Sequence, residues 1–102
     1  ELAQLVASEY SKQTRKLMKE LDHYISSRDS KKAKDCLHNL SGSSYNLRAN
    51  TFGDSCGKLG TMITEQSSYN EIEEQYNLIQ KSYITLQNHL NEFLESKASP
   101  NA

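Results

Sequence analysis

The feature that most constrains the fold is an apolar stripe in the C-terminal third of the chain. Between residues 72 and 93, apolar residues step by 4, 3, 4, 3, 4 and 3 positions: Ile72, Tyr76, Ile79, Tyr83, Leu86, Leu90 and Phe93. This spacing lines one face of an α-helix of about six turns. Ser68 and Glu71 form a capping-box pattern just before it. We therefore predict a long amphipathic helix that begins at this box.

Three more apolar stripes at helical spacing precede this one. The first contains Val6, Tyr10, Thr14, Leu17, Leu21 and Tyr24, flanked by Leu2, Leu5 and Ile25. The second, over residues 30–47, contains Ala33, Cys36, Leu37, Leu40, Ser44 and Leu47. The third, over residues 51–66, contains Phe52, Cys56, Leu59 and Ile63. We expect Asp29 or Ser30 to cap the second helix, and Asn50 or Thr51 to cap the third.

No stretch of the sequence alternates polar and apolar residues with period two, so we expect an all-α protein. Connections of a few residues favour antiparallel neighbours and an up-down-up-down four-helix bundle. Packing inside such a bundle accounts for the long stripe without a second chain, so we expect a monomer. We assign residues 1–96 to the bundle and residues 97–102, a polar tail containing Pro100, to a disordered segment.

The composition excludes several classes of protein. A length of 102 residues is enough for one domain. The formal net charge of -1 argues against a nucleic-acid binder, and the sequence has neither a membrane-spanning apolar run nor a secretory signal peptide. The two cysteines, Cys36 and Cys56, indicate free thiols in a reducing compartment, so we expect a cytoplasmic domain without membrane contact. Because the chain begins at Glu1 without methionine, we interpret it as a piece of a larger protein.

One segment, H-N-L-S-G-S-S at residues 38–44, departs from an ordinary helix sequence. The apolar face of its helix centres between Leu37 and Leu40, and His38 lies roughly 150° from that centre. We therefore expect the imidazole to face solvent. Gly42 lies beside it, although glycine costs about 1 kcal/mol in a helix interior. A glycine there leaves the surface open for another molecule. The same side of the helix also carries Lys34, Ser41 and Tyr45.

This segment resembles the signature of the histidine-containing phosphotransfer (HPt) domain, which is roughly H-x-L-K-G-S-S, then L-G-A, then C-x-x-L-E on the next helix. "HNLSGSS" supplies His38, Leu40, Gly42, Ser43 and Ser44, "LRA" supplies Leu47 and Ala49, and "CGKL" supplies Cys56 and Leu59. The upstream stretch also looks like the long first helix and acidic turn of the family. The resemblance extends from about Leu5 to Leu94.

The resemblance implies a phosphorelay module of a two-component system. His38 would accept a phosphoryl group from the phosphoaspartate of a receiver domain and pass it to an aspartate of a second receiver. The supporting residues that we predict around His38 are Lys34, Ser41, Gly42 and Ser43. The module would be no kinase and would need no cofactor or metal of its own, because the receiver brings the metal ion. The sequence leaves open whether the parent protein is a hybrid sensor histidine kinase or the domain stands alone, although the missing start methionine fits a C-terminal domain cut from such a kinase.

The departures from the family pattern leave an alternative open. Ser41 stands where the family usually has lysine, Arg48 where glycine commonly ends the helix, and Gly60 where an acidic or amide residue follows C-x-x-L. Lys34, one turn before the histidine, is a candidate replacement for the missing charge. The alternative is a binding-only bundle that docks a receiver or another partner without phosphotransfer. For Lys34 itself, the alternative is a solvated cluster with Lys31 and Lys32.

The remaining candidates have weaker support. Arg48 and Lys58 are further cations near the histidine helix. Gly53, Gly57 and Gly60 together cost about 2–3 kcal/mol of helix propensity. We interpret these three glycines as a close helix contact, with flexibility or a ligand surface as alternatives. His23 and His89 have no partner at metal-ligand spacing, so we interpret both as surface residues.

Overall fold

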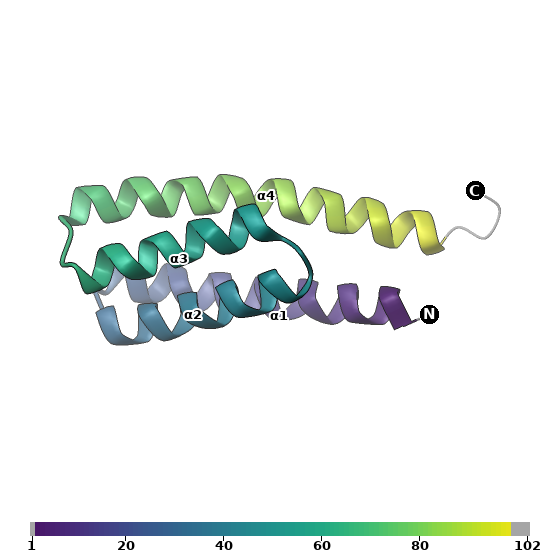
Figure 1. The fold of residues 1–102 in the computed structure, drawn as a ribbon, viewed down its shortest axis with the longest axis horizontal. Helices are drawn as coiled ribbons and strands as arrows, with labels where there is room; N and C mark the ends of the chain where they lie inside the picture. Colours follow the sequence, from purple (N-terminus) through teal and green to yellow (C-terminus); the bar gives the residue numbers. More distant parts are fainter. Residues whose placement is uncertain (1, 99–102) are drawn as a thin grey trace.

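The computed structural model describes residues 2–98, which form four α-helices and no strand: α1 (Leu2–Ser26), α2 (Ser30–Asn46), α3 (Asn50–Thr64) and α4 (Tyr69–Ala98). Consecutive helices run in opposite directions (Figure 1). α1 packs against α2 and α4, and α3 packs against the same two helices, so the four form a closed square. The predicted up-down-up-down bundle is confirmed. It is a rod of 52 × 21 × 19 Å.

The core lies along the middle of this rod, where all four helices overlap. Each predicted stripe contributes to it, and the side chains with almost no exposure include Leu21, Leu37, Leu40, Leu59 and Ile79. The buried Tyr10 and Ser44 hydroxyls share a hydrogen bond of 2.7 Å between α1 and α2. This bond satisfies two polar groups that the stripes place in the core.

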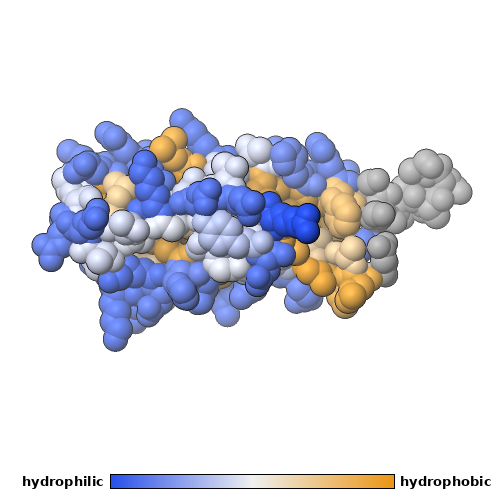
Figure 2. All heavy atoms as spheres, viewed as in Figure 1, coloured by the Kyte–Doolittle hydropathy of each residue, from blue (hydrophilic) through white to orange (hydrophobic). Residues whose placement is uncertain are grey.

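The stripes are wrong at their outer ends. Leu2, Leu5 and Val6 are 74%, 59% and 43% exposed, and Phe93 is 36% exposed. The reason is length, because α1 and α4 continue past the turn that joins α2 to α3 (Figure 1). Side chains beyond that turn have no second pair of helices over them. Figure 2 shows the resulting hydrophobic surface near the beginning of α1.

Two of the three predicted caps are confirmed. Asp29 caps α2, and its carboxylate accepts a hydrogen bond from the backbone N–H of Lys32 at 3.2 Å. Ser68 and Glu71 form the reciprocal capping box before α4, because each side chain accepts from the backbone N–H of the other at 3.2 Å. The α3 cap is wrong. α3 begins at Asn50 after Ala49, which makes no side-chain cap bond.

A shared turn geometry explains the missing cap. In the turn after α2, the N–H of Ala49 donates to the carbonyl of Ser44 and the N–H of Arg48 donates to that of Tyr45. This pair of bonds is the Schellman motif. The motif already includes Ala49, so α3 begins at the next residue. Arg48 has a φ of 60°, the left-handed conformation that glycine usually supplies. Its counterparts in the turns after α1 and α3 are Arg28 (φ 57°) and Gln66 (φ 59°).

The C-terminal boundary lies slightly later than expected. α4 continues through Lys97 to Ala98. Residues 99–102 lie outside the described residues, so the disorder expected for this part of the tail stays a prediction. Within residues 2–98, no helix combines the length and the apolar character that crossing a membrane requires.

Candidate functional site

His38 lies on α2 and is exposed, as the helical spacing predicts. Its side chain lines a groove of about 400 Å³ between α2 and α3. The side of the groove formed by α2 contains Lys34, Leu37, His38 and Ser41. The side formed by α3 contains Cys56, Gly57, Gly60, Thr61, Thr64 and Glu65. The structure therefore brings the candidate histidine and the candidate lysine into one concave surface.

Two of the three glycines in α3 keep this groove open. A Cβ atom at Gly60 would meet no described atom within 4 Å, and one at Gly57 would meet only the Ser41 hydroxyl oxygen at 3.7 Å. Close helix packing therefore does not require a glycine at either position. Gly53 differs, because a Cβ there would come within 3.0 Å of the Tyr45 ring. The packing interpretation holds for Gly53, whereas Gly57 and Gly60 leave space beside His38.

Gly42 lies on the exposed side of α2. A Cβ built on it would meet no described atom within 4 Å. Its φ is not positive, so the backbone there is one that any residue can adopt. Neither packing nor backbone geometry among the described residues requires glycine at this position.

The two candidate serines have different places. The Ser41 hydroxyl donates to the backbone carbonyl of Gly53 at 3.2 Å, so it joins α2 to α3 while lining the groove. The Ser43 hydroxyl donates within its own helix, to the carbonyl of Asn39 at 2.9 Å. Ser43 lines a separate hollow that α1 forms with the end of α2. The structure therefore groups Lys34, His38 and Ser41, and places Ser43 elsewhere.

The charges around the groove are mixed. Lys34 contributes a cation and Glu65, at the end of α3, contributes a carboxylate. Lys32 lies away from the groove, with its ammonium 5.9 Å from the centre of the Tyr24 ring. Lys31 and Lys58 are exposed and do not line it, and Arg48 lines a different hollow beside α4. Lys34 is therefore the cation of the predicted lysine cluster that the structure places beside the histidine.

Apart from its glycines, the residues that α3 contributes to the groove were not predicted from the sequence. Thr61, Thr64 and Glu65 complete the wall opposite His38, and the Thr64 hydroxyl donates to the Gly60 carbonyl at 3.1 Å. The available signal was helical spacing, because residues 57, 60, 61 and 64 share one face. Gly60 itself lies in this wall, so no carboxylate or amide side chain extends from that position toward the imidazole.

A tyrosine and an aspartate extend the same surface beyond the groove. The Tyr45 hydroxyl donates a hydrogen bond to the carboxylate of Asp54, across from α2 to α3. This bond, assisted by desolvation, raises the pKa of the Tyr45 phenol. The sequence places Tyr45 on the side of His38 but gives no sign of the partner on α3. The Tyr45 side chain is 45% exposed.

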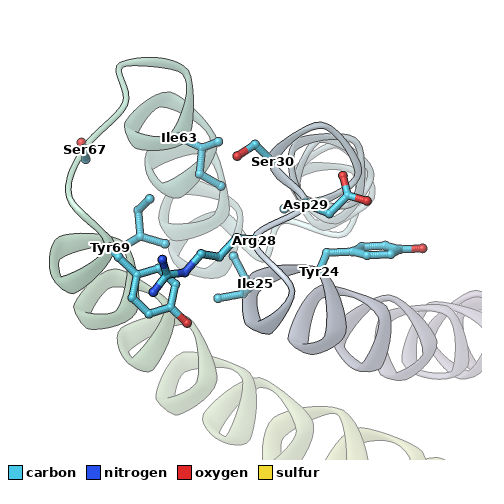
Figure 3. Close-up of a pocket in the computed structure, with 10 residues that line it drawn as sticks. Tyr24, Ile25, Arg28, Asp29, Ser30, Ile63, Ser67 and Tyr69 are labelled. Carbon is cyan, nitrogen blue, oxygen red and sulfur yellow. The ribbon is translucent and has the colours of Figure 1, made fainter.

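A second cavity lies at the end of the rod where α1 turns into α2. It has a volume of about 150 Å³, and Ile25, Ile63 and Ile72 are among its lining residues. The guanidinium of Arg28 lies 4.0 Å from the centre of the Tyr69 ring, so it connects the turn between α1 and α2 to the beginning of α4 (Figure 3). This cavity includes none of the candidate residues predicted from the sequence.

The two cysteines are free and buried. Burial raises the pKa of Cys36 to about 11 and that of Cys56 to about 12. The Cys36 thiol also donates to the carbonyl of Leu17 at 3.1 Å. Both groups are therefore held as unreactive thiols, and the expected free core thiols are confirmed.

The other two histidines lie on the surface, as expected. His23 packs edge-on against Tyr24, with 5.6 Å between the ring centroids, and His89 lines the hollow that also contains Arg48. Among the residues that the structure describes, no cluster of three or more His, Cys, Asp and Glu side chains is arranged to hold a metal ion.

Comparisons with protein-family models, with curated proteins and with solved structures find no match for this chain. Fold and site together define a four-helix bundle with an exposed histidine in an open interhelical groove. Its function follows from what that groove can do chemically.

Proposed function

We propose that this domain is a phosphorelay intermediate of the histidine-containing phosphotransfer type. His38 accepts a phosphoryl group from a phosphoaspartate on one receiver domain and passes it to an aspartate on another. The observation that carries the proposal is the combination of an exposed imidazole, an open groove beside it and a lysine on the same rim. The sequence signature around residues 38–59 supports it independently.

The chemistry requires little beyond this surface. A ring nitrogen of His38 attacks phosphorus, a P–N bond forms, and the P–O bond to the receiver aspartate breaks and releases its carboxylate. Positioning and electrostatics provide most of the catalysis in phosphoryl transfer. A helix in a packed bundle positions the ring, and the space at Gly57 and Gly60 admits the phosphoryl group and the approaching receiver. The receiver supplies the metal ion.

Lys34 is the residue that we propose for the charge that the family usually places three residues after the histidine. It lies one turn before His38 and lines the same groove. A cation there attracts both the phosphoryl oxygens and the acidic pocket of a receiver. Ser41 adds no charge, and its hydroxyl hydrogen is used by the Gly53 carbonyl. Its role in the proposal is to hold α3 against α2 beside the site.

The test is transfer of label from phosphorylated receivers to the domain. A panel of receiver domains is phosphorylated with a radiolabelled small-molecule phosphodonor, mixed with the domain and analysed for acid-labile label on it. We expect label from at least one receiver, none on the His38→Gln variant, and parental labelling of His23→Gln and His89→Gln. Labelling that survives His38→Gln, or no labelling by any receiver, would refute the proposal.

A matched pair of lysine variants tests the charge. Lys34→Ala should slow transfer and weaken receiver binding, whereas Lys81→Ala, an exposed lysine on α4, should do neither. Equal behaviour of the two variants would assign Lys34 to a solvated surface.

A second candidate function is receiver binding without transfer. Two observations favour it: Gly60 presents no side chain toward the imidazole, and the Ser41 hydroxyl already donates to the protein backbone. A receiver that binds tightly in titration calorimetry but leaves His38 unlabelled over hours would establish this function instead.

A further inference from the structure

Tyr45 is an exposed aromatic side chain whose position is fixed in the free protein. Its hydroxyl donates to Asp54 on α3. Its ring lies on Gly53, where an added Cβ would come within 3.0 Å of one ring carbon and 3.2 Å of two others. A hydrogen bond therefore fixes one end of the ring and backbone contact fixes one face. The missing side chain at Gly53 is what makes room for this arrangement.

Core formation does not account for this ordered ring. Tyr45 is 45% exposed, and it is absent from the cluster of buried residues that forms the core. An ordered but exposed tyrosine has already lost much of its side-chain freedom before a partner arrives. Binding to it therefore costs less conformational entropy, which is how preorganised aromatic anchors gain affinity. Tyrosine is also among the residues enriched at interface hot spots.

The location of the ring relates it to His38. Tyr45 follows His38 by seven positions, which is about two helical turns or roughly 10 Å along α2, on nearly the same side. A protein interface of ordinary size covers about 800 Å² per partner, a patch roughly 30 Å across. A receiver whose aspartate reaches His38 therefore also covers Tyr45. The ring is nevertheless too distant to touch the transferred phosphoryl group.

Resting on the proposed function, we propose that Tyr45 is the aromatic anchor of the receiver-docking surface and determines receiver affinity rather than the rate of the transfer step. The partner is a receiver that presents an aliphatic or methionine side chain to the exposed face of the ring. Asp54 and Gly53 act through Tyr45 as positioning residues, because they hold the ring in the orientation that the receiver contacts.

The experiment compares transfer kinetics of Tyr45 variants, using a phosphorylated receiver that labels His38 in the parental protein. Tyr45→Ala removes the ring, and Tyr45→Phe keeps the ring but loses the bond to Asp54. Ile84→Ala is the control, because Ile84 is a 61% exposed apolar residue on α4, which does not pack against α2. Each His38 accepts one phosphoryl group, so single-turnover labelling over a range of receiver concentrations gives an apparent Kd for the receiver and a transfer rate constant. The melting temperature is measured for each variant as well.

We expect Tyr45→Ala to raise the apparent Kd by about tenfold with the transfer rate constant near the parental value. Tyr45→Phe should raise the apparent Kd by roughly two- to threefold, because the ring remains but is less restrained. Ile84→Ala should change neither constant. If Tyr45→Ala lowers the melting temperature and leaves the apparent Kd unchanged, the ring is structural and the inference is wrong, while the proposed function stands. If the parental protein is labelled by no receiver, the proposed function fails and the inference fails with it.

Discussion

The substitution Gly42→Ala tests separately how much stability the helical glycine costs and whether access to His38 requires it. Gly42 lies in the interior of α2, and a methyl group there meets no described atom within 4 Å. The substitution therefore gains helix propensity, about 0.8–1.0 kcal/mol, without a steric penalty. In a domain of this size that gain raises the melting temperature by roughly 4–8 °C.

Alanine substitutions at two further glycines provide comparisons for the stability change expected of Gly42→Ala. Gly60→Ala also places its methyl group in open space, so it should stabilise the protein by a similar amount. Gly53→Ala brings its methyl group within 3.0 Å of the Tyr45 ring, so the ring must move and the gain should shrink or reverse. Thermal melts followed by far-UV circular dichroism, together with urea denaturation, give the three values.

The same variants are then tested for receiver labelling. If Gly42 keeps the surface beside His38 accessible, Gly42→Ala should be more stable than the parental protein and slower in transfer, with a larger side chain slower still. A variant that is stabilised and transfers at the parental rate would show that Gly42 does not serve access. A destabilised variant would refute the assignment of Gly42 to an unobstructed helix surface.

Three other predictions follow from the turns, caps and thiols. Arg48→Gly relieves about 1–2 kcal/mol of left-handed strain, and the greater freedom of glycine in the unfolded chain offsets part of this gain. Urea denaturation should show that Arg48→Gly is more stable than the parental protein. Arg48→Ala keeps the strain and should not be more stable. Asp29→Ala removes the α2 cap and should cost about 1 kcal/mol in the same assay, with Asp29→Asn close to parental. Burial raises the pKa of Cys36 to about 11 and that of Cys56 to about 12 from 9.0. The contribution of the two protonated thiols to the free energy of unfolding is therefore complete below pH 9.0 and is lost as the pH rises through the folded values. Stability should therefore fall between these limits, and iodoacetamide should label neither thiol before unfolding.

Local patterns predicted the central part of the bundle well. The stripes through Leu21, Leu40, Leu59 and Ile79 identify the core because helical spacing decides which side of a helix is buried. Asp29 and the Ser68–Glu71 box are visible in the sequence because each cap acts within four residues. These features depend on interactions within one helix or its flanking turn.

Contacts between helices were harder to predict. Nothing near Leu5 indicates that α2 ends too early to cover it, because that depends on the relative lengths of two helices. The pairing of Tyr45 with Asp54 depends on the register between α2 and α3. The same register decides that Gly53 is covered while Gly60 is open. The position of the histidine was therefore predictable, whereas the face of α3 that lies opposite it was not.

The overhang of α1 and α4 has a mechanical consequence. The beginning of α1 and the end of α4 both lie at the overhanging end of the rod, opposite the α1–α2 turn (Figure 1). A host protein fused to both of these helix ends would be attached to the bundle at one end of the rod only. The α2–α3 groove begins beyond the overhang, so both its walls would stand clear of the host surface. The bundle can therefore be inserted into a loop of another protein with His38 still open to a third molecule.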